Sequence, residues 1–144
     1  AALSLAYRHS RFKDPAGRGE VILGATVRLQ TDRPESIKAR LEEIRAWRRA
    51  HQPLGIPSAG SVFRNPASGP SAGALIEAAG LKGARSGGAE ISTMHANWIV
   101  NRGGATAADI RALRDRCIEA VRAATGTLLV SEIAFLGADG SAES

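Results

Sequence analysis

Near the middle of this chain, a serine lies between prolines that interrupt regular structure on both sides. Pro53 and Pro57 precede Ser61, and Pro66 follows it. Because proline fixes the backbone φ angle and has no N–H to donate, regular structure should stop on both sides. The sequence therefore predicts a short extended run, 61–64, that presents Ser61 at the edge of a rigid loop. The alternative is an ordinary loop-to-strand junction whose serine only caps or turns the chain.

The order of apolar patterns along the chain predicts an α+β fold, a small mixed or antiparallel sheet with helices packed on it. Extended segments are expected at 1–8, 20–30, 61–64, 89–92, 98–100 and 127–136, and helices at 31–50, 72–79 and 107–125. The first two strands should form a hairpin. We expect a first, incomplete domain, then a second domain and a disordered tail, at 1–32, 33–137 and 138–144.

Two of the expected helices have an apolar stripe at helical spacing. The stripe of the first should be buried and comprises Ile37, Leu41, Ile44 and Trp47. The last helix has a capping residue, Thr106, at its start and Gly126 at its end. Cys117, the single cysteine, lies on the apolar face of that helix, so we expect a buried thiol without a chemical role.

The charge of the chain permits an anionic partner but does not indicate one. Nineteen Lys and Arg against fourteen Asp and Glu give a net charge of +5. Aromatic residues make up only 4% of the chain, and none interleave with basic residues as in RNA-binding modules. No apolar run approaches the ~20 residues that span a bilayer. We therefore expect no nucleic acid or membrane partner, no metal site, and a composition that suits the reducing cytoplasm.

Period two over 127–136 places Glu132 on one face with Leu128, Val130 and Ala134. A carboxylate in such a row has two explanations. It is an edge residue that reaches solvent, which we expect here, or a buried group whose raised pKa suits it to acid-base work.

Taken together, these segments resemble the carboxyl-terminal part of the UDP-N-acetylenolpyruvoylglucosamine reductases, flavoenzymes of bacterial cell-wall precursor synthesis. The matching runs fall in family order at 7–13, 52–66, 72–83, 87–89, 95–101, 105–109 and 131–133. The resemblance implies reduction of UDP-N-acetylglucosamine enolpyruvate to UDP-N-acetylmuramate, with FAD as hydride carrier and NADPH as its reductant. It further implies that residues 1–32 end a FAD-binding domain, whose missing amino-terminal half is the expected partner of this chain.

The resemblance also implies roles for particular residues. Ser61 matches the serine that protonates the substrate carbon, Glu132 matches the glutamate of the site, and Arg8 matches an arginine suited to stabilise developing negative charge. The expected substrate contacts are Tyr7, His51, Arg64, Asn65 and His95. His51 departs from the family, because many members have lysine there. No cofactor-binding residue is assigned in this part of the chain.

Two alternatives of other classes remain open. Without the flavin half, the chain could serve as a non-catalytic nucleotide-sugar-binding domain. The net charge also allows a basic nucleic-acid module, whose binding would depend strongly on salt.

Overall fold

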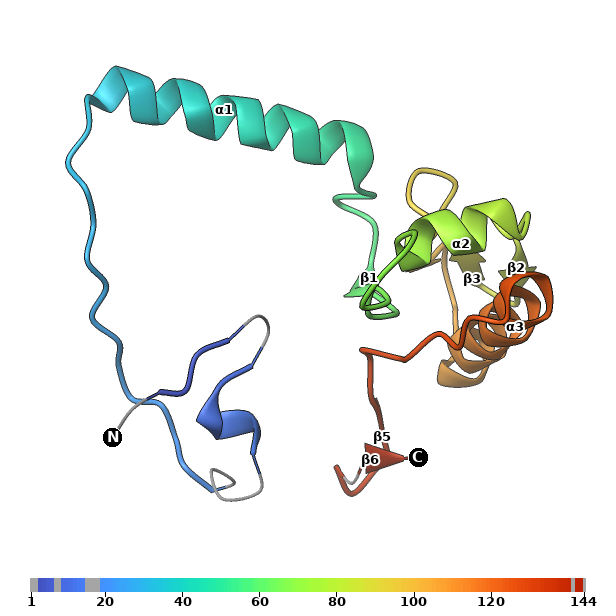
Figure 1. The fold of residues 1–144 in the computed structure, drawn as a ribbon. Coiled ribbons are helices and arrows are strands. Elements are labelled where there is room, and N and C mark those ends of the chain that lie inside the picture. The colour runs from blue at the N-terminus through green and yellow to red at the C-terminus, as the bar shows by residue number, and fades with distance from the viewer. Residues whose placement is uncertain (1–2, 7–8, 15–18, 141, 144) are drawn as a thin grey trace. The chain divides into compact units, whose positions relative to one another are not determined.

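The computed structural model describes residues 3–6, 9–14, 19–140 and 142–143. Tyr7 and Arg8, both expected at the site, lie outside the described residues. The chain forms two compact units, Ala1–Ile37 and Lys38–Ser144. Figure 1 follows the chain through its helices and strands.

The first unit has little regular structure among its described residues. A single 3-10 turn, η1, covers Arg11–Lys13, and an isolated bridge joins Ala6 to His9. The guanidinium of Arg11 donates two hydrogen bonds of 2.7 Å to the carboxylate of Glu20. These contacts fix a loop and form no sheet.

The expected strand at 20–30 is wrong for the described structure, and so is the hairpin it was to form with 1–8. No regular element covers 20–30, and the large apolar residues that alternate along it are exposed by 71% to 94%: Val21, Leu23, Val27 and Leu29. A lone strand leaves its backbone N–H and C=O groups without partners, so it needs a neighbour to persist. Among the described residues this segment has none.

Helix α1 covers Pro34–His51, close to the expected 31–50. Pro34 begins the helix, where its missing N–H costs nothing, and cations lie in the last turn. The expected burial of the apolar stripe is wrong: its members are 45% to 56% exposed, at Ile37, Leu41, Ile44 and Trp47. An amphipathic helix buries its stripe only against a matching surface, and the described residues leave this face uncovered.

The second unit is built on a four-stranded antiparallel sheet in the order β1-β4-β3-β2. Its strands are β1 (Ser58–Ser61), β2 (Arg85–Ser86), β3 (Ala89–Ile91) and β4 (Trp98–Asn101). Strand β2 lies in a glycine-rich stretch outside the segments that were expected to be extended. It forms a hairpin with β3, pairing Ser86 with Ala89.

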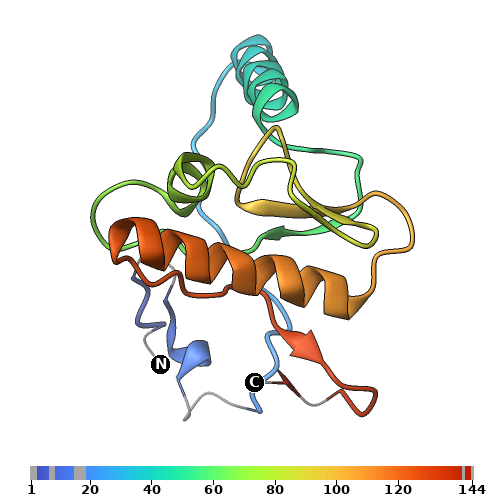
Figure 2. The same ribbon diagram turned by 90° about the vertical axis from the view of Figure 1, so that its right-hand side faces the viewer.

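Two helices pack on this sheet, which confirms the α+β class. Helix α2 covers Ala72–Ala78 and α3 covers Ala107–Thr125, the range expected for the last helix. Helix α3 lies lengthwise along β2 and β3 and contacts α2 (Figure 2). Thr106 and Asp109 cap its start reciprocally, and Gly126 ends it with a φ of 73°, a conformation that favours glycine.

Cys117 lies in the core between α3 and the sheet and is 1% exposed, as expected. Burial raises the pKa of its thiol to about 12. We predict that the folded protein resists alkylation by iodoacetamide at pH 8, because the thiolate is the reactive form, and that denaturant makes Cys117 react fully. Mass spectrometry of the labelled protein measures this. Fast labelling of the native protein would contradict the buried location.

The expected last strand, 127–136, is only partly regular. Ser131 forms an isolated bridge with Phe63, and β5 covers just Phe135–Leu136. The period-two pattern nevertheless holds, because Leu129 and Phe135 are buried while Leu128 and Val130 are exposed by 61% and 52%. In the tail expected to be disordered, Ala142–Glu143 form β6 and pair with β5.

Candidate functional site

Ser61 ends β1 at the point where the chain passes from the surface into the core. It pairs with Trp98 of β4 and is half-buried, while the next two residues, Val62 and Phe63, are at most 2% exposed. Gly60, just before it, has a φ of 82°, which only glycine adopts without strain. The backbone around Ser61 is therefore fixed by the strand, the glycine and the core behind it.

Glu132 lies on the segment beside Ser61. Its N–H donates to the carbonyl of Val62 at 2.7 Å, and the N–H of Arg64 donates to the carbonyl of Val130 at 2.9 Å. With the bridge between Phe63 and Ser131, these bonds run 61–64 antiparallel to 130–132. Glu132 is exposed, which confirms the edge location expected for its side chain and removes deep burial as a source of acidity. The structure thus places the backbone segments that carry Ser61 and Glu132, two of the three expected catalytic residues, side by side.

Arg64 and Asn65 line a cavity of about 360 Å³. Its other walls are Pro66, Ala67, Leu128 and Val130. The side-chain oxygen of Asn65 accepts the N–H of Ala72 at 3.1 Å and so ties this loop to the start of α2. The arginine side chain is exposed, so the cavity offers one cation to an anionic group.

His95 lines a separate cavity of about 220 Å³ together with Glu77 and Met94. Its Nδ1 accepts the N–H of Asn97 at 3.2 Å, so the proton of the neutral ring lies on Nε2. Burial lowers the pKa of His95, which favours that neutral form. A Cβ on Gly73 would lie 3.1 Å from the ring, so a glycine there leaves room for His95.

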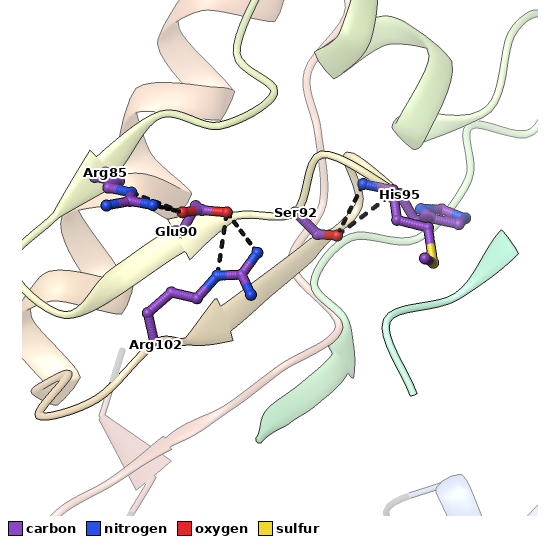
Figure 3. Close-up of polar contacts among 6 residues, drawn as sticks. Arg85, Glu90, Ser92, His95 and Arg102 are labelled. Carbon is purple, nitrogen blue, oxygen red and sulfur yellow. Dashed lines mark hydrogen bonds and ion pairs between the residues drawn. The ribbon is translucent and has the colours of Figure 1, made fainter. Parts of the chain in front are cut away.

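Ser92 sets the loop that carries His95. Its hydroxyl accepts the N–H groups of Met94 and His95 at 3.2 and 3.3 Å (Figure 3). Ser92 is 2% exposed, so a buried hydroxyl holds the backbone of this turn.

His51 is not brought to the cavities described for Arg64, Asn65 and His95. Its ring stacks on Trp47 at 4.5 Å, and its Nδ1 lies 2.8 Å from the carbonyl of Trp47. A further cavity of about 360 Å³ begins at the adjoining residues, Gln52 and Arg49, and reaches Arg102. The role expected for His51 in binding substrate remains a prediction.

Sequence reasoning missed a buried carboxylate. Glu90 in β3 is 3% exposed and receives hydrogen bonds from Arg102 at 2.8 and 3.2 Å and from Arg85 at 2.6 Å (Figure 3). The bonds from Arg102, with those from Arg85, hold the pKa of Glu90 below its usual value although burial raises it. All three residues lie in or beside the strands β2 to β4, so this cluster stabilises the sheet.

We predict that Glu90→Gln lowers the free energy of unfolding by about 2 kcal/mol, the range of hydrogen bonds to charged groups. The pKa of Glu90 is lower in the folded state than in the unfolded state. The contribution of Glu90 to the free energy of unfolding is therefore present above its unfolded pKa and is lost as the pH falls through its folded pKa. Denaturant unfolding across acidic pH measures both effects. The exposed Glu119 on α3, changed to Gln, is the matched control. We expect the free energy of unfolding of the wild type to fall more steeply with acid than that of Glu90→Gln. Equal slopes in the two proteins would contradict the prediction.

Within the described part of the chain, no cluster of three or more His, Cys, Asp or Glu side chains is arranged to hold a metal ion. None of the described helices is both long enough and apolar enough to cross a membrane.

A family model for the carboxyl-terminal domain of UDP-N-acetylenolpyruvoylglucosamine reductase matches residues 52–136, more than half of the chain. The chain belongs to this family. The matched range contains Ser61 and Glu132. It also contains all four strands of the sheet, β1 to β4, and the two helices packed on it, α2 and α3. It excludes 1–51, where Tyr7, Arg8 and His51 lie.

Curated relatives and a solved structure agree with this membership. The chain is 47% identical over 135 residues to the UDP-N-acetylenolpyruvoylglucosamine reductase of Geobacter sulfurreducens, covering 94% of this chain and 43% of the relative. The enzyme of the same name from Heliobacterium modesticaldum is 46% identical over 138 residues, or 96% and 43% of the two chains. The crystal structure of the Thermus caldophilus reductase matches with a TM-score of 0.58 at 43% identity, over 71% of this chain and 35% of that one. The chain thus spans about two fifths of the length of the curated relatives it matches.

Proposed function

We propose that the full-length protein containing this chain reduces the enolpyruvyl group of UDP-N-acetylglucosamine enolpyruvate to give UDP-N-acetylmuramate. This reaction belongs to peptidoglycan precursor synthesis in the cytoplasm. Membership of the reductase family supports the reaction class. The observation that supports the mechanism is the backbone pairing of 61–64 with 130–132, which brings the segments of Ser61 and Glu132 side by side.

In this proposal Ser61 delivers a proton to the substrate. Addition of hydride to the terminal vinyl carbon leaves negative charge on the adjacent carbon and its carboxylate. The hydroxyl of Ser61 protonates that carbon, and Glu132 hydrogen-bonds the site or returns a proton to the serine. Serine is a weak acid, so the transfer depends on close placement beside a strongly basic carbon. Arg8 is assigned to stabilising the developing charge.

The substrate contacts are proposed on the same basis. Arg64 offers a cation at its cavity, and Asn65 and His95 offer side-chain amide and imidazole N–H donors. A neutral His95 suits a neutral or partly charged oxygen of the substrate. Tyr7 and His51 complete the proposed set.

FAD and NADPH are the cofactors we propose, with FAD held by the rest of the protein. The cavities lined by Arg64, His95 and Arg102 measure about 360, 220 and 360 Å³. None of these three cavities is large enough for a dinucleotide, so we propose that FAD binds to the rest of the protein.

The apolar surface of 20–47 supports an amino-terminal half as partner. Exposed side chains recur there on 20–30 and on α1, among them Leu23 at 94% and Trp47 at 56%. Within each of these two stretches, a series of apolar side chains this exposed is typical of a surface that another part of a protein covers. The curated relatives carry more than half of their length outside the matched region, and we propose that this part covers the surface.

Turnover of the full-length protein tests the function. Supplied with NADPH and UDP-N-acetylglucosamine enolpyruvate, it should consume both and yield UDP-N-acetylmuramate, detected by mass spectrometry. NADPH consumption without the product would overturn the proposal.

The cavities that offer Arg64 and His95 to a ligand also suit a second candidate, a non-catalytic nucleotide-sugar-binding domain. Calorimetry of this chain, with and without the amino-terminal half of a family member, separates the two. Substrate binding without recovered turnover would favour the binding domain. Recovered turnover would favour the reductase.

A further inference from the structure

The side chain of Asn97 occupies a place that a strand backbone would normally fill. Its Oδ1 accepts the N–H of Phe63 at 2.9 Å, and its Nδ2 donates to the carbonyl of Phe63 at 2.8 Å. A carboxamide offers a donor and an acceptor as a peptide group does. The register between β1 and β4 shifts between Ser58 and Ser61, and the carboxamide continues the pairing beyond that irregularity.

The backbone of Asn97 makes two further bonds, one to the residue after Ser61 and one to His95. Its carbonyl accepts the N–H of Val62 at 2.8 Å, next to Ser61. Its N–H donates to Nδ1 of His95 at 3.2 Å and fixes the tautomer of that ring. Asn97 is 4% exposed, so these bonds are made away from solvent. One residue thus holds both the segment that carries Ser61 and the ring of His95.

The other flank of the same segment is held by backbone alone. Val62 accepts from Glu132 and Arg64 donates to Val130. The peptide groups between Ser61 and Arg64 are therefore fixed on one side by Asn97 and on the other by 130–132. Removing the carboxamide would leave the N–H and carbonyl of Phe63 unpaired in a buried place, which is costly.

We propose that Asn97 is a positioning residue that sets Ser61 relative to His95 and Glu132 during the proposed reduction. The inference rests on the proposed function for its catalytic readout. Small displacements of a reacting group can cost about 10²-fold in rate. Asn97 touches no substrate in this assignment and acts through the backbone of Val62 and Phe63.

The test compares Asn97→Leu and Asn97→Asp in the full-length protein. Asn97→Leu removes both side-chain bonds at similar volume, and Asn97→Asp keeps the acceptor for Phe63 but loses the donor. We expect kcat for substrate reduction to fall at least ~10-fold in both variants, with a small change in KM, while NADPH still reduces the flavin at the wild-type rate. Amide hydrogen exchange at Phe63 should accelerate in Asn97→Leu. Glu90→Gln, a buried polar change on β3, is the control for lost stability.

The outcomes separate the two proposals. If the wild-type protein fails to reduce the substrate, the proposed function falls, and exchange at Phe63 still reports whether Asn97 holds the segment. If the wild-type protein turns over and both Asn97 variants keep kcat within about 2-fold, the positioning role is overturned. An equal loss of kcat in Glu90→Gln would also overturn it, because the loss would then follow stability and not placement.

Discussion

Ser61→Ala in the full-length enzyme is expected to lower kcat for substrate reduction by about 10²–10⁴-fold, the usual contribution of a positioned acid or base. In the proposed mechanism the serine acts only after hydride has left the flavin, so reduction of the flavin by NADPH should proceed at the wild-type rate. The structure supports this assignment through the fixed backbone of Ser61 and its neighbour Glu132. Rapid-mixing spectroscopy of the flavin measures the two half-reactions separately.

Ser58→Ala provides the matched control. Ser58 begins the same strand and is exposed, and the contact its hydroxyl makes among the described residues is a long one of 3.4 Å with the N–H of Gly60. Both half-reactions should be unchanged in that variant. Slow flavin reduction in Ser61→Ala would place the serine in the wrong half-reaction and remove it as the proton donor.

Gly88→Ala should destabilise the second unit by at least about 3 kcal/mol, the upper end of what overpacking costs. A Cβ at this position would lie 2.2 Å from the carbonyl oxygen of Gly103 and 2.5 Å from the backbone N of Ala105. Both neighbours are backbone atoms, so no side chain can rotate away. The carbonyl of Gly88 also accepts the N–H of Arg102 at 2.8 Å, and separating the two loops would strain that bond.

Denaturant unfolding measures the effect, with Gly24→Ala as the control. A Cβ on Gly24 meets no atom within 4 Å, so this variant should stay within about 0.5 kcal/mol of wild type. A loss below about 1 kcal/mol in Gly88→Ala would mean that the 103–105 loop yields easily, contrary to the close packing described here.

Elements whose signals are local were predictable from the sequence. Helix α3 begins and ends where its capping residues, Thr106 and Gly126, indicated, and Cys117 is buried on its apolar face. Each of these signals depends on residues within a few turns of one another. The alternation of buried and exposed residues over 128–135 was predictable for the same reason, although the full ladder does not form.

Elements that need a distant partner were not predictable. The stripe of α1 and the alternating residues of 20–30 have the patterns of buried surfaces, yet the described residues leave them exposed. A pattern shows that a face can be buried and does not supply the surface that covers it.

The candidate site shows the same division. The exposed location of Glu132 followed from period two, but the strand at Ser61 was misplaced: an extended run was expected to begin at Ser61 and cover 61–64, whereas β1 covers Ser58–Ser61 and ends there. The bonds between Asn97 and Phe63 span 34 positions of sequence, and nothing in the run around Asn97 indicates that its side chain replaces a strand. Glu90 was likewise hidden, since an acidic residue in a short strand does not reveal two arginines gathered around it.

The outward row of 128–132 has a consequence for experiments on Glu132. Leu128 and Val130 are exposed by 61% and 52% on an extended segment, the kind of surface through which copies of a protein adhere to one another. We expect the single negative charge of Glu132 in that row to oppose self-association, as charged residues beside exposed apolar strands do in other proteins. A neutral variant of Glu132 would lose this repulsion, so its activity should be normalised to the monomer fraction before any loss is attributed to chemistry.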